Sequence, residues 1–274
     1  MLGGAIIKVD PVVCVGTVKY RGERFVQTDI ANLKEAAKAA GIADDHVFLP
    51  ATAPSGVGAN EYYKSEEDYF HALAEELRKE YKAIVDSGIL VQIDDPFLPD
   101  IFFEPGLEDA QKRRRAQIYV EATNTALKGI PAERVRFHTC YGINEGPRIY
   151  EAALSDIIEY VLKVNAGSFS FEAANPRHEH EYHLFETVKI PEGRVLCPGV
   201  ITHASNIVEH PELICERILR YANLVGRENV IAAADCGFSS QAMYKTEVHY
   251  TVVWEKFKAM REGADLATRR LWKN

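Results

Sequence analysis

The chain has 274 residues, of which 47% are hydrophobic and 26% are charged, with 18 glycines and 12 prolines. These values are those of an ordinary globular protein and exclude a disordered, collagen-like or disulfide-dense chain. The net charge of −8 disfavours nucleic acid and anionic membrane surfaces as partners, because their phosphates would repel the protein. No apolar run of the sequence reaches the roughly 18–20 residues that span a bilayer.

The N-terminus and the cysteines favour a cytoplasmic protein. The opening MLGGAIIKVDPVV lacks a basic segment followed by an apolar core, which argues against a secretory signal. The five cysteines are odd in number and widely spaced, which is typical of reduced thiols, some of them ligands. We expect Cys14, Cys197 and Cys215 to be small core or helix residues. The sequence leaves a homo-oligomer open.

From about residue 45 onward, short apolar β-type runs alternate with amphipathic helical runs. The expected strands cover residues 46–51, 89–94, 135–140, 168–173, 194–200 and 229–235. The expected helices cover residues 65–87, 108–128, 151–164, 178–188, 210–226 and 247–271. Near-continuous apolar runs are typical of buried parallel strands, so the alternation indicates a parallel α/β sheet, open or closed. In such folds chemistry collects at the carboxyl ends of the strands.

Two helix starts carry local signals. Ser65 precedes three acidic residues, which suit the positive end of a helix, and Pro211 stands where a first helical turn tolerates proline. The basic run at residues 112–115 lies on an expected helix and is interpreted as a solvated face rather than an anion site.

Residues able to bind a metal end several of the expected strands. His138 and Cys140 end one strand, Glu172 ends the next, and Cys236 follows the last. His138 and Cys140 are two apart, so on a strand they point to the same face. Two thiolates, one imidazole and one carboxylate are a ligand set that suits zinc. The alternative is that these are separate buried cysteines and a hydrogen-bonded histidine without metal.

Three further polar residues follow expected strands. Asp94 and Asp95 end the strand at 89–94, where a carboxylate could bind a substrate ammonium or cap the turn before Pro96. His203 follows the strand at 194–200 and could act as a general acid, or be a loop histidine without a role.

A polar cluster opens the helix expected after Glu172. It contains His180 and His183, whose spacing of three could bind metal. Because the cysteines provide a better site, we interpret the cluster as a polar first turn around the mouth of a pocket.

The ligand set favours one kind of chemistry over another. A zinc held by two thiolates and a carboxylate is a poorer Lewis acid for water than a tri-histidine site. It is better suited to a substrate thiol, since a coordinating thiol is deprotonated outright. Activation of a thiol for alkylation is therefore the expected reaction type, and metal-assisted hydrolysis is a less natural alternative.

The same residues carry a resemblance to a known family. The H-x-C pair, the following glutamate and the final D-C-G resemble the C-terminal barrel of cobalamin-independent methionine synthase. The match is closer to its single-barrel relatives, which include epoxyalkane:coenzyme M transferases. The similarity runs from about residue 11 to residue 272 through QIDDP, FHTCYG, SFEAANPRHEHE, CPGVITH, EHPELICERI and GRENVIAAADCGFSS.

The resemblance implies a fold and a set of roles. The fold is a (β/α)8 barrel forming one zinc-binding domain over residues 1–274. The family's zinc ligands fall on the four residues already selected. Asp94 matches the aspartate that holds the amino group of homocysteine, and His203 matches the histidine proposed to protonate the departing pterin.

The sequence departs from the family at two places. The first two β/α units of the family barrel, which carry a glycine-serine segment and a glutamate, have no counterpart here. The chain opens at PVVCVGTVKYRG, which resembles a later hairpin of the family and predicts a hairpin at residues 11–22. Six expected strands stand where closure calls for eight, which predicts a truncated or alternatively started barrel. The segment TAPSGVGANEYY lacks the tryptophan associated with folate stacking, which leaves the donor open.

Two classes of function follow. The first is a zinc-dependent thiol alkyltransferase that joins a small thiol, homocysteine or one like coenzyme M, to an alkyl donor, a methyl-folate or an epoxide. The second is a catalytically silent, zinc- or thiol-binding remnant of the barrel.

Overall fold

A computed structural model of the chain describes residues 12–142, 151–238 and 248–272. The chain divides into two compact units. Unit 1 comprises residues 1–137 and 163–166, and unit 2 comprises residues 138–162 and 167–274. Within the described ranges, no helix is both long enough and apolar enough to cross a membrane.

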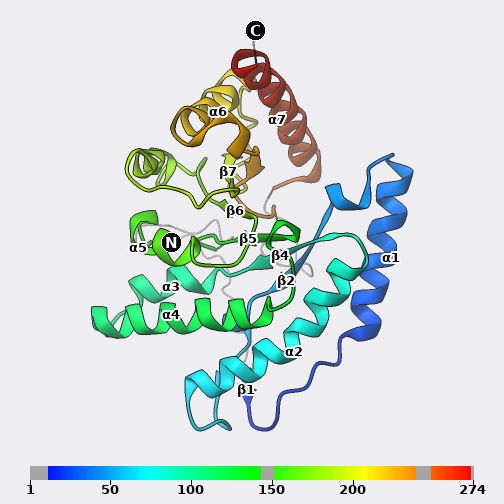
Figure 1. Cartoon of the computed structure of the whole chain (residues 1–274). Coiled ribbons are helices and arrows are strands. Elements are labelled where there is room, and N and C mark those ends of the chain that lie inside the picture. The colour runs from blue at the N-terminus through cyan, green and yellow to red at the C-terminus, as the bar shows by residue number, and fades with distance from the viewer. Residues whose placement is uncertain (1–11, 143–150, 239–247, 273–274) are drawn as a thin grey trace. The chain divides into compact units, whose positions relative to one another are not determined.

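Unit 1 alternates strands and helices. In chain order its elements are β1 (Val13–Cys14), α1 (Glu23–Ala39), η1 (Asp44–His46), β2 (Phe48–Thr52), η2 (Pro54–Gly56), β3 (Ala59–Asn60), α2 (Glu66–Asp86), β4 (Leu90–Asp94), α3 (Phe97–Phe103), α4 (Asp109–Ala126), η3 (Ala132–Arg134) and β5 (Val135–His138), whose last residue belongs to unit 2. Strand β2 pairs in parallel with β4, from Phe48 beside Leu90 to Thr52 beside Asp94. The long helices α2 and α4 pack against each other (Figure 1).

Unit 2 continues the same pattern. Its elements are α5 (Leu154–Val161), β6 (Ser168–Phe171), η4 (Glu179–Glu186), β7 (Val195–Ile201), α6 (Pro211–Val225), η5 (Arg227–Asn229), β8 (Ala233–Ala234) and α7 (Tyr250–Leu271). Strand β7 pairs in parallel with β6 on one side and with β8 on the other. The parallel α/β class predicted from the alternation is thereby confirmed, whereas the (β/α)8-barrel type and the single domain over residues 1–274 stay predictions.

The expected helix starts are confirmed. The Ser65 hydroxyl accepts a hydrogen bond from the Asp68 amide at 3.0 Å and caps α2. Pro211 is the first residue of α6. Both signals are local, so they do not depend on long-range contacts.

Several elements differ from expectation. In place of the hairpin at 11–22, the described residues from 12 onward contain the short strand β1, which pairs in parallel with β3. Helix α1 was not expected at all. The segment 178–188 is a 3-10 helix rather than an α-helix, and the expected strand at 229–235 is reduced to β8.

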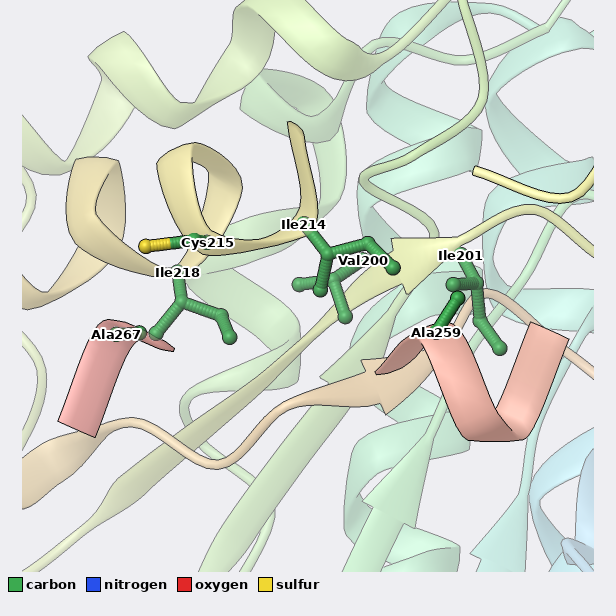
Figure 2. Close-up of a cluster of buried hydrophobic side chains, with 7 residues drawn as sticks. All are labelled: Val200, Ile201, Ile214, Cys215, Ile218, Ala259 and Ala267. Carbon is green, nitrogen blue, oxygen red and sulfur yellow. The ribbon is translucent and has the colours of Figure 1, made fainter. Parts of the chain in front are cut away.

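A cluster of buried apolar side chains joins β7, α6 and α7 (Figure 2). It is made of Val200, Ile201, Ile214, Cys215, Ile218, Ala259 and Ala267. The two alanines on α7 are separated by eight residues, with Gly263 midway between them, so α7 presents a face of small residues. This face lets α6 and α7 approach closely over the strand.

Substitution of Gly263 by alanine should destabilise the protein. A Cβ atom at this position would meet the Ile214 Cγ2 atom at 2.5 Å and the Pro211 carbonyl oxygen at 2.8 Å. Alanine in a helix normally gains about 1 kcal/mol over glycine, but overpacking costs about 1–3 kcal/mol, so the sign reverses. Urea unfolding should therefore show a lower free energy of unfolding for Gly263→Ala. The exposed neighbour Glu262→Ala should change it by less than about 0.5 kcal/mol, and a stabilised Gly263→Ala would contradict the packing.

Candidate metal centre

Two cysteines and a histidine from separate segments of unit 2 come together. His138 is the last residue of β5, Cys140 follows it by two, and Cys236 follows β8. The Cys236 sulfur lies 3.5 Å from the Cys140 sulfur. One ligand atom from each of the three residues lies within 4.8 Å of the other two. His138 and Cys140 are buried, and Cys236 is partly buried.

The donor set and its spacing fit a zinc ion. Two sulfurs bound to one tetrahedral zinc at roughly 2.3 Å are roughly 3.8 Å apart, close to the observed separation. The hydrogen bond from Cys236 and burial raise the pKa of the Cys140 thiol. The Cys140 thiol therefore resists ionisation unless a cation compensates the charge. The His138 Nδ1 atom lies 3.2 Å from the Ser170 hydroxyl, a contact that orients the imidazole ring.

Glu172 lies in a neighbouring group rather than with the sulfurs. It follows β6, is 1% exposed, and lies with His203 and Asp235 in a set whose ligand atoms are within 4.8 Å of one another. One carboxylate oxygen accepts a hydrogen bond from the Tyr141 amide at 2.9 Å, and the other accepts one from the Asn175 side chain at 2.9 Å. Of the four predicted ligands, the structure thus brings three into one group and places the fourth beside His203.

Asp235 was not among the predicted site residues. It precedes Cys236 and is fully buried. One carboxylate oxygen accepts hydrogen bonds from the Ala173 and Ala174 amides, each at 2.8 Å. Burial and the nearby Glu172 carboxylate raise the pKa of Asp235 to about 7. Its position between a strand and a candidate ligand, as the first residue of the D-C-G motif, is the sequence signal that could have singled it out.

The absence of a side chain at residue 199 on β7 makes room for Asp235. A Cβ atom on Gly199 would lie 1.8 Å from the Asp235 carboxylate. The aspartate therefore reaches across β7 to hold the backbone that follows Glu172, and links the segments carrying Glu172 and Cys236.

His203 lies on the segment after β7 and is 2% exposed. The structure therefore places it in the interior of unit 2, within the group of Glu172 and Asp235. One imidazole nitrogen of His203 therefore lies within 4.8 Å of a carboxylate oxygen of Glu172 and of Asp235.

The polar cluster after Glu172 separates into buried and exposed members. His178 is 4% exposed, and its ring stacks on Tyr141 at 3.9 Å between centroids. Its nitrogens lie 2.8 Å from Glu181 and 3.2 Å from Glu151. Burial lowers the pKa of His178, but the two carboxylates outweigh it and raise the pKa overall. The stack orients Tyr141, whose amide holds Glu172.

The two histidines considered as an alternative metal pair are on the surface. His180 is exposed, and His183 is paired with Glu186 at 2.6 Å in an exposed position. Neither belongs to a group of potential metal ligands among the described residues.

The two aspartates at the end of β4, in unit 1, differ in role. The Asp95 carboxylate accepts hydrogen bonds from the Ser55 hydroxyl at 2.8 Å and the Leu98 amide at 3.1 Å, so it holds the turn that leads into α3. The capping alternative therefore describes Asp95. Asp94 is partly buried and accepts a hydrogen bond from the Gln92 side chain at 2.8 Å.

The charge of Asp95 should make stability depend on pH. Burial raises the pKa of Asp95 to about 6 from an unfolded value of 3.8, and its hydrogen bonds only partly oppose this. The folded protein thus binds a proton more tightly than the unfolded chain. The unfavourable contribution of the charged form is fully present above pH 6 and is relieved as the pH falls toward 4.

We expect wild type to gain on the order of 2–3 kcal/mol of unfolding free energy relative to Asp95→Asn between pH 7 and pH 4. Urea unfolding of both proteins at several pH values measures this difference. The exposed Asp86→Asn serves as control and should show no such trend. A constant difference between wild type and Asp95→Asn would contradict the assignment.

A cavity of about 400 Å³ opens at the carboxyl ends of β6 and β7 in unit 2. Its walls include Asn175 and Arg177 after β6, and Thr202 and Ser205 after β7. Asn175 also holds Glu172, and Thr202 is next to His203. Space for a small molecule therefore exists beside the residues that end these strands.

Known proteins resemble the chain in sequence and fold. It is 26% identical to the methionine synthase of Thermococcus kodakarensis over 234 residues, which cover 82% of this chain and 58% of the relative. It is 20% identical to the 2-hydroxypropyl-CoM lyase of Xanthobacter autotrophicus, covering 94% and 70% of the two chains. The structure of a B12-independent methionine synthase from Shewanella sp. W3-18-1, in complex with selenomethionine, has the same fold. The TM-score is 0.73 at 19% identity, with 94% of this chain and 71% of the other covered.

The matches cover most of this chain but only part of each relative. The chain spans about half the length of the methionine synthases it matches, 58% and 45% in two of them. The family described as "Cobalamin-independent synthase, Catalytic domain" matches residues 8–264, which is nearly the whole chain. The chain therefore belongs to the family of cobalamin-independent synthase catalytic domains.

Proposed function

We propose that the chain is a zinc-dependent thiol alkyltransferase that transfers a methyl group to a small thiol, homocysteine, in methionine biosynthesis. The donor in this proposal is a methyl-folate of the 5-methyltetrahydropteroyltriglutamate type. The observation that carries the proposal is the convergence of Cys140, Cys236 and His138, with sulfurs 3.5 Å apart. Membership of the cobalamin-independent synthase family supports the reaction type.

In this proposal zinc is held by His138, Cys140, Cys236 and Glu172. When bound, zinc supplies thiolate character, because a thiol that coordinates it loses its proton at neutral pH and the thiolate is the nucleophile. Among these four residues, Glu172 also accepts hydrogen bonds on both carboxylate oxygens, from the Tyr141 amide and from the Asn175 side chain.

Two residues act on the substrates. His203, buried beside Glu172 and Asp235, delivers a proton to the leaving group of the alkyl donor. Asp94 binds the ammonium of the amino acid thiol, an assignment that rests on the family resemblance alone. A fold of the (β/α)8-barrel type and a cytoplasmic location belong to the same proposal.

A second candidate is thiol alkylation of the epoxyalkane:coenzyme M transferase type, with an epoxide as donor. The observation favouring it is the likeness to a 2-hydroxypropyl-CoM lyase over 94% of the chain. A zinc- or thiol-binding domain without catalytic activity is the remaining alternative.

Assays of two thiols against two electrophiles distinguish these candidates. Homocysteine and coenzyme M are each incubated with zinc-loaded protein and either methyltetrahydropteroyltriglutamate or an epoxide, and the thioether product is measured. Formation of methionine alone supports the first proposal, and opening of the epoxide by coenzyme M supports the second. Zinc bound at about one per chain without any thioether product would support the non-catalytic form, and absence of stoichiometric zinc would exclude all zinc-dependent candidates.

A further inference from the structure

Lys256, in the second turn of α7, has no exposed surface. Lysine is rarely buried completely unless its charge is paired. The ammonium donates hydrogen bonds to the Glu209 carboxylate at 2.8 Å and to the Ile207 carbonyl at 2.6 Å. Both acceptors lie on the segment between β7 and α6, residues 202–210, so one buried lysine ties this segment to α7.

Glu209 closes the same segment on itself. The carboxylate oxygen not bound to Lys256 accepts a hydrogen bond from the Thr202 amide at 2.8 Å. The two ends of the segment 202–209 are thereby joined through one buried side chain, which is 8% exposed. Within the segment, the Ser205 hydroxyl accepts a hydrogen bond from the Ile207 amide at 3.0 Å and stabilises a local turn.

His203 is the second residue of this closed segment. It is buried beside Glu172 and Asp235 although the segment that carries it has no regular helix or strand. A side chain on an irregular segment keeps one direction only where surrounding contacts hold the backbone. Among the contacts that hold this backbone, the one that joins its two ends is made by Glu209, and the charge of Glu209 is compensated by Lys256.

We propose that Lys256 is a positioning residue, which holds His203 in its reactive direction through Glu209. The inference rests on the proposed function in so far as His203 transfers a proton there. Lys256 lies on α7 and acts on His203 only through Glu209. It is not one of the proposed zinc ligands.

The variant Lys256→Met tests the inference in the zinc-loaded chain of 274 residues. Methionine keeps an unbranched side chain, one heavy atom shorter than that of lysine, and removes the charge. Hydrogen exchange followed by mass spectrometry should show amides of residues 202–209 exchanging at least about 10-fold faster, because their anchor is lost. The kcat should fall by about 10- to 100-fold, as expected for a misplaced acid, while KM for the thiol changes less than about twofold. Zinc content should remain that of wild type.

Lys258→Met is the matched control. Lys258 lies one half-turn further along α7, is exposed, and pairs with Glu255. Its removal should alter neither exchange of residues 202–209 nor kcat. Lys256→Arg, which restores a cation, should recover part of the lost kcat and protection.

Glu209→Gln provides a second, milder test should Lys256→Met fail to fold. Glutamine retains an acceptor for the Thr202 amide and weakens only the pairing with Lys256. Amide exchange at residues 202–209 should therefore also become faster, but by a smaller factor than in Lys256→Met. Unchanged exchange at residues 202–209 in either folded variant would overturn the inference, as would faster exchange with an unchanged kcat. Should wild type transfer no alkyl group, the proposed function fails, while exchange in the two variants still decides whether Lys256 holds the segment.

Discussion

Cys236→Ser is expected to bind zinc at least about 100-fold more weakly than wild type. Loss of a partner that only supports a metal ligand already costs about 10- to 100-fold in affinity, and loss of a ligand removes more. A serine hydroxyl is also a far poorer zinc ligand than a thiolate. Competition with a chromophoric chelator at neutral pH measures the affinity, and metal analysis after dialysis measures the stoichiometry. Alkyl transfer should fall with zinc content.

The matched control for this variant is Cys215→Ser. Cys215 is a fully buried cysteine of the same unit, packed between α6 and α7 (Figure 2). Its substitution should leave zinc affinity unchanged, because its sulfur belongs to no group of potential ligands among the described residues. Equal zinc affinity for Cys236→Ser and wild type would remove the basis of the proposed function.

The second large effect is expected at His203. His203→Gln keeps a polar side chain of similar size but cannot transfer a proton, so kcat should fall by about 100- to 10,000-fold. KM for the thiol should change little, since the proton is delivered to the leaving group of the donor. Steady-state kinetics with saturating donor separates the two constants.

His180→Gln controls for loss of a histidine as such. His180 is exposed on η4 and lies outside both groups of potential ligands. It should retain wild-type kcat and zinc content. Retention of kcat by His203→Gln would show that protonation of the leaving group depends on another residue or on solvent.

The strands and most helices could be predicted because their patterns are local. Residues 89–94 were expected as a strand, and β4 spans Leu90–Asp94. Helix α1 could not be predicted, because it buries only Val26, Ile30 and Ala37 over 17 residues and has no side-chain cap. The segment 178–188 has a helical composition, but Phe185 is the only buried residue of η4, so packing does not enforce an α-helix.

The sequence by itself determined which residues end parallel strands, and hence that His138, Cys140, Glu172 and Cys236 would follow strands at one edge of a sheet. Strand periodicity is a backbone property, and parallel strands align their carboxyl ends, so this much follows without tertiary contacts. Only the tertiary structure decided that Glu172 would face His203 and Asp235 and that Lys256 would be buried. Side-chain direction and charge pairing depend on residues distant in the chain, such as Tyr141 for Glu172 and Glu209 for Lys256, which no local pattern encodes.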